Sequence, residues 1–405
     1  MDNKHCSSIL KLPDSNLMAQ HLKNFFTNPK SLAVAKAFFL LGFMFGNWAS
    51  LIPYIKDRHG LGDDELGLVL LCLPLGALSF NPISTILIDR YGLNMFTNGS
   101  MIALATAYSL PILSPSILLL SISLVIVGCT MTALNIGANI MATKIQEQES
   151  ILILSSCHGM FSIGLMIGSL MRSMTLGLQL TEQWHIISMT IFGLFIAYSS
   201  SLILNTIPTK NIYTYKDSKA KFVFPKGNLL IMVLISVCIN MTEGSMSDWA
   251  ALFMQDVVQS SPYYVAWGLT SYSAMMALGR FFGDGIIPLI GRNRVLFIGA
   301  LTSIVGLMIV IFLPYTFTAI VGFGLVGLGV SCGAPILYAS ATNFPDIPNG
   351  GGLAIMNTFA MGGFLFGPVI IGFISQASSL RVGFGLVAVL SLFWLWQGRK
   401  VILFG

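Results

Sequence analysis

LAVAKAFFLLGFMFGNWASLIPYI, residues 32–55, carries one charged side chain, Lys36, in a stretch long enough to cross a bilayer. About 20 apolar residues in a helix span the hydrocarbon core of a membrane. Similar runs, bounded by charges, prolines or polar loops, follow along the chain. They lie at about 65–87, 95–112, 116–143, 151–177, 185–205, 228–253, 263–286, 294–313, 316–343, 352–376 and 382–402. The sequence therefore predicts an all-α polytopic membrane protein with about twelve transmembrane helices.

The composition supports this fold class. Of the 405 residues, 55% are hydrophobic and 9% are charged, which would leave a water-soluble protein short of polar surface. The formal charge of +5 reports membrane topology more than an anionic partner. The cysteines are scattered without a CxxC pair, and His5 with Cys6 supplies too few ligands for a metal. We expect no metal, no cofactor and no nucleic-acid partner.

The apolar runs form two groups of six, separated by a lysine-rich polar stretch. We expect a cytoplasmic N-terminal tail at 1–31, a six-helix bundle at 32–205, a cytoplasmic linker at 206–227 and a second six-helix bundle at 228–402. The halves share a short motif, since Asn47-Trp48-Ala49-Ser50-Leu51 recurs as Asp248-Trp249-Ala250-Ala251-Leu252. Parallel repeats of this kind predict a binding cavity where the halves meet, near the middle of the membrane.

Basic residues are divided unevenly between the two sides of the predicted membrane. The side of the N-terminal tail holds Lys4, Lys11, Lys23, Lys30, Arg90, Lys144, Lys210, Lys216, Lys219, Lys221, Lys226, Arg292, Arg294, Arg399 and Lys400. The other side holds Lys56, Arg58, Arg172 and Arg381. Because Lys and Arg accumulate in cytoplasmic segments, both termini are predicted to lie in the cytoplasm.

Glycines four residues apart predict close contacts between helices. Such pairs occur at Gly42 and Gly46, Gly164 and Gly168, and Gly363 and Gly367. Without a side chain, each pair lets a neighbouring helix backbone approach closely.

Charged loop motifs follow the second predicted helix of each half: Asp89-Arg90-Tyr91-Gly92, and Gly279-Arg280, Asp284 and Gly291-Arg292-Asn293-Arg294. Their placement resembles the major facilitator superfamily. Four further segments are similar to its MosC-like branch: Gly46 to Ser50, Ala133-Leu134-Asn135, Ser155 to Gly159, and Glu243 to Trp249. The resemblance covers roughly residues 35–400. It implies two six-helix bundles, alternating access and a bacterial cytoplasmic membrane, and through a rhizopine-associated membrane protein it suggests polyols or amino sugars as substrates.

The sequence departs from the family pattern at two places. Thr85 stands where the loop motif usually has Gly, and Leu93 and Asn94 stand where basic residues usually follow. Asn135 stands where related sequences often carry Asp, which argues against a proton role at that position.

Two carboxylates are the candidates for proton coupling. Glu243 lies deep in the seventh predicted helix, where an ionisable group is costly and is by default functional. It either binds a proton or hydrogen-bonds a polar substrate; the alternative is a structural carboxyl satisfied by Asn240 and Ser247. Asp248 lies nearer the outer edge, where capping of the helix end or contact with solvent is an equal alternative.

Polar and aromatic side chains supply candidates for substrate binding. Indole rings such as those of Trp48 and Trp249 stack on sugars or cations, although interfacial belts also place tryptophans at matched depths. Asn47 accompanies Trp48 in the repeat. The fourth helix carries a polar stripe, for which hydrogen bonding between helices is the alternative. Its members are Thr132, Asn135, Asn139 and Thr143.

The remaining candidates concern proton relay and gating. His158 lies in the fifth helix, where imidazole suits proton relay or substrate contact, and Asn357 in the eleventh is a weaker candidate of the same kind. Asp89 with Arg90, and Arg280 with Asp284, are placed at cytoplasmic helix ends, where opposite charges tie the halves together in one state and release them in another. Topogenic anchoring is the alternative.

The predicted function is secondary transport of a small polar solute, such as a sugar, polyol or amino sugar. We expect protons as the coupling ion and a monomer surrounded by lipid. Efflux of amphipathic compounds is the alternative, and a membrane sensor without flux is a third. An enzyme is not expected, because the cluster of Ser155, Ser156, Cys157 and His158 lacks a matching acid and a nucleophile elbow.

Overall fold

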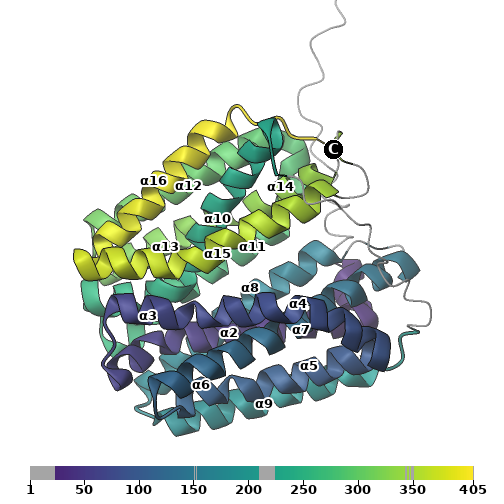
Figure 1. Ribbon diagram of the computed structural model, residues 1–405, viewed down its shortest axis with the longest axis horizontal. Helices are drawn as coiled ribbons and strands as arrows, with labels where there is room; N and C mark the ends of the chain where they lie inside the picture. The colour runs from purple at the N-terminus through teal and green to yellow at the C-terminus, as the bar shows by residue number, and fades with distance from the viewer. Residues whose placement is uncertain are drawn as a thin grey trace, which may run out of the picture.

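The structure is a computed structural model that describes residues 23–149, 151, 153–208, 224–342, 344–345, 347 and 351–404. Most of the expected N-terminal tail and linker lie outside these residues. All regular elements in the described part are helices, which Figure 1 shows as two bundles, one formed by α2 to α9 and the other by α10 to α16.

The N-terminal half contains α2 to α9. Their bounds are α2 Pro29–His59, α3 Asp63–Leu70, α4 Cys72–Tyr91, α5 Leu93–Ala107, α6 Ser109–Leu113, α7 Ile117–Glu149, α8 Leu154–Gly177 and α9 Glu182–Leu204. The elements α3 with α4, and α5 with α6, each follow one another as a broken helix. Six helical segments therefore cross this bundle.

The C-terminal half contains α10 to α16. Their bounds are α10 Gly227–Leu252, the π-helical turn η1 Phe253–Val257, the short η2 Pro262–Tyr264, α11 Trp267–Ile290, α12 Arg292–Phe312, α13 Thr316–Val330, α14 Gly333–Thr342, α15 Gly351–Ala377 and α16 Leu380–Gly398. With α13 and α14 taken as one broken helix, this half also has six helical segments.

Helix pairs pack in the same way in both halves. In the first half α2 packs against α8, α4 against α7 and α5 against α9; in the second half α10 packs against α15, α11 against α13 and α12 against α16. Corresponding helices thus have corresponding neighbours. This confirms the predicted fold of two six-helix repeats.

Ten helical segments among the described residues are long and apolar enough to cross a membrane. The other two segments of the bundles are α5 with α6 and α11. α5 packs against α7 and α9, and α11 packs against α8 and α13, so both run inside the bundles beside spanning helices. The chain is an integral, multi-pass membrane protein.

Local sequence sets the ends of the first spanning helix. The side chain of Asn28 caps α2 by accepting hydrogen bonds from the backbone N–H groups of Lys30 and Ser31. The helix ends at Gly60, whose φ of 62° is left-handed and therefore favours glycine. We call this end of the molecule the Gly60 end and the opposite one the Pro29 end.

The predicted glycine contacts are confirmed. A Cβ added at Gly42 would collide with the carbonyl oxygen of Phe161, and one added at Gly164 would collide with that of Phe39. The backbones of α2 and α8 therefore touch directly. Gly363 of α15 makes the equivalent approach to Val237 of α10.

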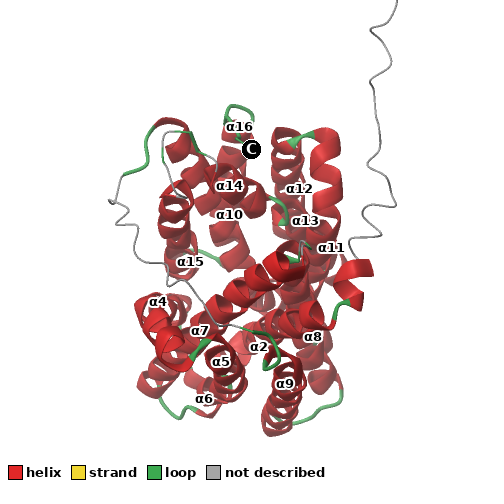
Figure 2. Ribbon diagram, turned by 90° about the vertical axis from the view of Figure 1, so that its right-hand side faces the viewer, coloured by secondary structure: helices red, strands yellow, loops and turns green. Residues whose placement is uncertain are grey.

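The two halves meet along α8 with α11 and along α3 and α4 with α15. The turned view shows α11 above α8 and α15 above α4 (Figure 2). At the Gly60 end of the molecule, α3 and α15 approach each other closely. A Cβ added at Gly372 of α15 would lie 3.2 Å from the Cα of Gly67 in α3. A bulkier residue at either position would push the halves apart.

Candidate functional site

A buried ion pair lies inside the C-terminal half. Oε1 of Glu243, in α10, is 3.3 Å from Nη2 of Arg280, in α11. Only 16% of the Glu243 side chain and 12% of the Arg280 side chain are exposed. Glu243 lies 16 residues after the first residue of α10, which at ~1.5 Å per residue places it about 24 Å along the helix. Removing one partner would leave a charge in a poorly solvated place, so the pair is strongly coupled.

Arg280 also connects this pair to the other half. Its Nη1 donates a hydrogen bond of 2.9 Å to Oγ of Ser162 in α8. The Ser162 hydroxyl in turn donates to the carbonyl oxygen of His158, at 3.4 Å. A change in the charge of Glu243 would thus alter a contact between the two bundles.

The structure corrects the expected positions of two groups. Arg280 was expected at a cytoplasmic helix end, but it lies near the middle of α11, where it faces Glu243. The prediction was wrong because Arg280 was grouped with the loop motif at the end of the helix, although it lies within the helix. Likewise, Glu243 was expected either unpaired or satisfied by Asn240 and Ser247. Asn240 donates to the carbonyl oxygen of Ala360, and Ser247 reaches only the backbone of Glu243.

Asp284, Asp89 and Arg90 are the other three expected gating residues. The side chain of Asp284 lies outside the part of the chain that the structure describes. Asp89 and Arg90 are exposed at the end of α4, and the guanidinium of Arg90 lies 5.4 Å from the ring centre of Tyr91. Neither Asp89 nor Arg90 has an ion-pair partner among the described residues.

Asp248 differs from Glu243 in its surroundings. It lies five residues further along α10 and is partly exposed. Among the described residues its carboxylate has neither an ion-pair partner nor a hydrogen-bond donor. Asp248 is therefore a carboxylate without a counter-charge among the described residues.

Asn47, Trp48 and Trp249 of the internal repeat are buried. Asn47 and Trp249 are 0% exposed and Trp48 is 1% exposed. The amide of Asn47 donates to the carbonyl oxygen of Phe43, while its own Oδ1 and the Nε1 of Trp249 are buried without a partner. In this conformation neither indole ring has a free face for a solute. The expected contacts of these three residues with substrate stay predictions for another conformation.

The polar stripe of the fourth spanning segment is accessible. Asn135 and Thr143 are exposed, and Nδ2 of Asn139 donates to Oδ1 of Asn135 at 2.9 Å. Asn135 follows the exposed Ile126 by nine residues, and a rotation of ~100° per residue puts it on the opposite face of α7. If Ile126 faces lipid, the asparagines face the interior of the protein.

Asn357 follows the same pattern in α15. It is exposed and precedes the exposed Phe366 by nine residues, so the two lie on opposite faces of the helix. His158 is partly exposed, and its ring meets Phe38 edge to face with ring centres 5.0 Å apart. Asn135 and Asn357 are thus exposed in this conformation and Asn139 and His158 only partly so, whereas Asn47, Trp48 and Trp249 are buried.

A second charged group, which the sequence did not indicate, joins the halves at the Gly60 end. Nζ of Lys56 lies 2.7 Å from Oδ1 of Asp63 and 2.9 Å from Oδ2 of Asp256, which belongs to the other half. Asp63 also accepts a hydrogen bond from Ser375 of α15. We call Lys56, Asp63, Asp256 and Ser375 the Gly60-end clamp. A lysine and an aspartate seven residues apart around a short loop were its only signal in the sequence.

Polar contacts between α8 and α11 extend this junction. Oγ of Ser169 and Oγ1 of Thr270 are 2.7 Å apart. The indole of Trp267 donates to Oγ of Ser173 at 3.0 Å, and that hydroxyl donates to the carbonyl oxygen of Tyr263. The halves are therefore tied by hydrogen bonds from the Gly60 end to the level of Arg280.

Known proteins share both sequence and fold with this chain. An uncharacterized MFS-type transporter of Yersinia pestis is 33% identical over 359 residues, covering 88% of this chain and 91% of that protein. The membrane protein MosC of Rhizobium meliloti is 26% identical over 358 residues, covering 87% and 86%. A crystal structure of the nucleoside transporter NupG has a TM-score of 0.71 at 12% identity, covering 92% of this chain and 99% of that one.

A bacterial homologue of the human lysosomal transporter Spinster, solved in an inward-facing and occupied conformation, has a TM-score of 0.66 at 15% identity. It covers 92% of this chain and 96% of its own. Two six-helix halves, a fold shared with transporters, define a multi-pass transmembrane transporter. The model of the Major Facilitator Superfamily matches residues 34–257 and 232–403, and the chain belongs to that family.

Proposed function

We propose that the protein is a proton-coupled secondary transporter of a small polar solute that works by alternating access. The observation that carries this proposal is the bridging position of Arg280. One of its nitrogens pairs with Glu243 in its own half, and another donates to Ser162 in the other half. Proton binding at Glu243 would remove the negative charge that holds Arg280, and would thereby change how the bundles contact each other.

Contacts between the halves at the Gly60 end, and exposed polar side chains toward the Pro29 end, support a conformation that is open at the Pro29 end. The Gly60-end clamp and the contact of Gly67 with Gly372 hold the halves together at one end. The side chains of Asn135, Thr143 and Asn357, which lie toward the other end, are exposed. With both termini in the cytoplasm, as the distribution of basic residues indicates, this is an inward-open state of a protein in the bacterial cytoplasmic membrane.

The chemistry of the accessible site favours a hydroxyl- or amine-bearing solute. The asparagines of α7 offer amide donors and acceptors, and Asp248 offers a carboxylate without a counter-charge. A sugar, polyol or amino sugar satisfies such groups better than an apolar compound does. The similarity to a nucleoside transporter adds nucleosides to the classes worth testing.

The test has two steps on the purified protein. A thermal-stability screen against inositols, amino sugars, other sugars, nucleosides and amphipathic cations first identifies a ligand. At one hundred times its dissociation constant, a ligand stabilises by about 2.7 kcal/mol. Uptake of that solute is then measured in proteoliposomes with and without a pH gradient, for the wild type and Glu243→Gln.

We expect Glu243→Gln to abolish accumulation driven by the pH gradient while exchange of solute across the membrane persists. Glu182→Gln is the matched control, because Glu182 is also paired with an arginine, Arg172, but lies at the start of α9 within one half. Undiminished gradient-driven uptake by Glu243→Gln would refute proton coupling at this residue. Binding without flux in the wild type would instead indicate a sensor.

A further inference from the structure

Four cations lie close together at the Pro29 end of the C-terminal half. Arg292 and Arg294 are in the first turn of α12, and Arg399 and Lys400 directly follow α16. The guanidinium of Arg399 lies 4.4 Å from the ring centre of Phe297 in α12, and Nζ of Lys400 lies 4.3 Å from that of Trp396. We call these four residues the α12/α16 basic cluster.

Hydrogen bonds hold the two chain segments of this cluster together. Nδ2 of Asn293 donates to the carbonyl oxygen of Val401 at 2.8 Å, and Nη1 of Arg292 donates to that of Phe404 at 2.6 Å. On the other side, Asn228 exchanges two hydrogen bonds with the backbone of Ile402, at 2.7 and 2.9 Å. The cations are thus kept near one another although like charges repel.

Nothing in the described part of the chain neutralises the cluster. None of its four members has an ion-pair partner among the described residues. The N-terminus of α12, a helix of 21 residues, adds a partial positive charge at the same place. The cluster therefore attracts an anion from its surroundings.

The surface beneath the cluster faces lipid. On α12 the exposed residues after Arg294 are Ile298, Leu301, Val305, Met308 and Phe312, at helical spacing. On α16 the exposed Val389, Leu392 and Trp396 precede Lys400 in the same way. Cations thus stand next to exposed apolar side chains on two helices that pack against each other.

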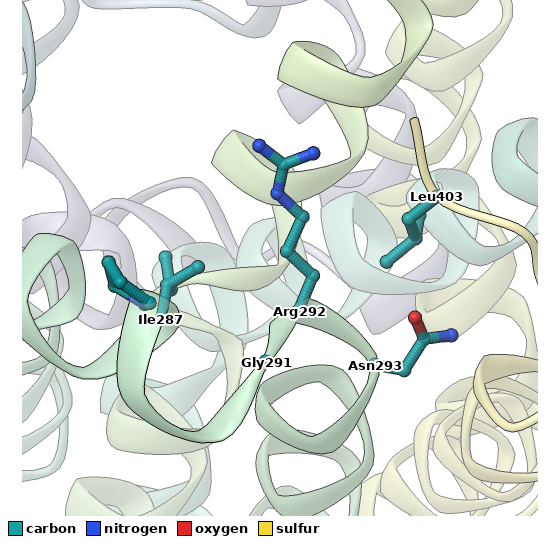
Figure 3. A pocket seen from close by; sticks show the side chains of 6 residues that line it. Ile287, Gly291, Arg292, Asn293 and Leu403 are labelled. Atoms are coloured by element: carbon teal, nitrogen blue, oxygen red, sulfur yellow. The ribbon is translucent and has the colours of Figure 1, made fainter. Parts of the chain in front are cut away.

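A cavity of about 440 Å³ opens beside Arg292. Figure 3 shows Arg292 between Ile287 on one side and Asn293 and Leu403 on the other. A polar group therefore has room next to the guanidinium, beside the apolar side chains of Ile287, Pro288 and Leu403.

We infer that the α12/α16 basic cluster binds the headgroup of an anionic phospholipid whose acyl chains lie along α12 and α16. Cations at a membrane interface attract anionic lipids, and basic pockets between spanning helices bind their phosphates. The aromatic ring of Trp396 sits at the depth where indoles favour the interface. This binding is independent of the solute and of proton coupling.

The test uses the fluorescence of Trp396, which is 55% exposed and lies under Lys400. Purified protein is placed in vesicles of phosphatidylcholine containing either brominated phosphatidylglycerol or brominated phosphatidylcholine, since bromine quenches a tryptophan that it touches. We expect more quenching by the anionic lipid. The excess should fall with rising salt and should disappear in Trp396→Phe, which removes the reporter.

Removing charge tests the assignment. Relative affinity for the anionic lipid should fall about 5-fold for each cation removed, in Arg294→Gln and in the triple variant Arg294→Gln/Arg399→Gln/Lys400→Gln. The single variant Arg294→Gln keeps the test valid if the triple variant misfolds. No described contact involves the Arg294 side chain, so its replacement should leave the fold intact. Arg381→Gln, on an exposed arginine at the opposite end of α16, is the control and should change nothing. Equal excess quenching in the wild type and the triple variant, or an equal loss in Arg381→Gln, would overturn the inference.

Discussion

Glu243 and Arg280 form an ion pair between α10 and α11, with Oε1 and Nη2 3.3 Å apart and both side chains largely buried. Breaking such a pair from one side leaves the other charge unpaired in a medium that solvates it poorly. We therefore expect Arg280→Met to destabilise the protein by on the order of 3 kcal/mol. The double variant Glu243→Gln/Arg280→Met should lose less than the sum of the two single variants, because it leaves no buried charge.

Thermal unfolding of the four proteins in one detergent measures this coupling. A coupling energy within about 0.5–3 kcal/mol is expected for residues in contact. The pair of Lys30 and Glu149 is the control, since it has a shorter N–O distance of 2.5 Å but 35% and 30% of its side chains are exposed. Exposed pairs contribute little to stability, so a smaller coupling energy is expected for this pair. Strict additivity at Glu243 and Arg280 would show that the two charges do not depend on each other.

The fold was predictable because its main determinants are local in the sequence. Runs of apolar residues require a spanning helix, and the glycine pairs at 42 and 46 and at 164 and 168 require close backbones. The apolar runs and the glycine pairs can each be recognised within one segment of the sequence. The equal division into two halves followed from the lysine-rich stretch between them.

The site was only partly predictable, because its contacts join segments far apart in the chain. The depth of Glu243 could be counted along one helix, but its partner Arg280 depends on how α10 and α11 cross. Lys56 and Asp256 are 200 positions apart, and nothing in either segment points to the other. For Trp48 and Trp249 the sequence suggested an accessible surface that the structure does not show. Their matched positions in the two halves suggested rings available for stacking, but packing buries both.

The Gly60-end clamp leads to a second prediction. Lys56 is the cation between Asp63 and Asp256, so Lys56→Met leaves two carboxylates facing each other across the halves. We expect the Gly60 end to open more often. In a cysteine-free background, a cysteine at Ser50, which is 3% exposed in α2, should then react faster with a membrane-impermeant maleimide.

The control for this experiment is Lys30→Met, which removes a lysine of the same helix paired with Glu149 inside one half. It should leave the labelling rate at Ser50 unchanged. An unchanged rate in Lys56→Met as well would mean that the clamp does not hold the Gly60 end closed.

Close packing at the same end gives a third prediction. A Cβ added at Gly372 would collide with the backbone oxygen of Asp63, so Gly372→Ala should separate α3 from α15. Since this contact joins two bundles that each keep their own core, we expect opening of the Gly60 end with little loss of helix content. Faster labelling at Ser50 together with unchanged circular dichroism would show this.

Gly385→Ala is the matched control, because a Cβ at Gly385 in α16 meets nothing within 4 Å. Gly42→Ala gives the contrasting case inside one half. There the added methyl group meets the backbone of Phe161, and we expect loss of thermal stability instead of opening. If Gly372→Ala melts as early as Gly42→Ala, the α3–α15 contact belongs to the core of the fold and not to a movable junction.

The fourth prediction concerns the asparagines of α7. Asn135 is exposed and accepts a hydrogen bond of 2.9 Å from Asn139, so neither amide supports the packing of the bundle. Asn135→Ala and Asn139→Ala should therefore leave thermal stability nearly unchanged. If the amides hydrogen-bond the solute, each variant should lose about 0.5–1.5 kcal/mol of binding, which is a rise of roughly 2- to 13-fold in the dissociation constant.

Titration of the solute identified by the stability screen measures that rise. Asn98→Ala is the control, because Asn98 of α5 donates to Asn205 at 2.8 Å, next to the end of α9. Solute affinity should not change in this variant. Should Asn135→Ala and Asn139→Ala bind the solute as the wild type does, the face of α7 is not the binding surface. The next candidate would be the carboxylate of Asp248, which is partly exposed and has no counter-charge among the described residues.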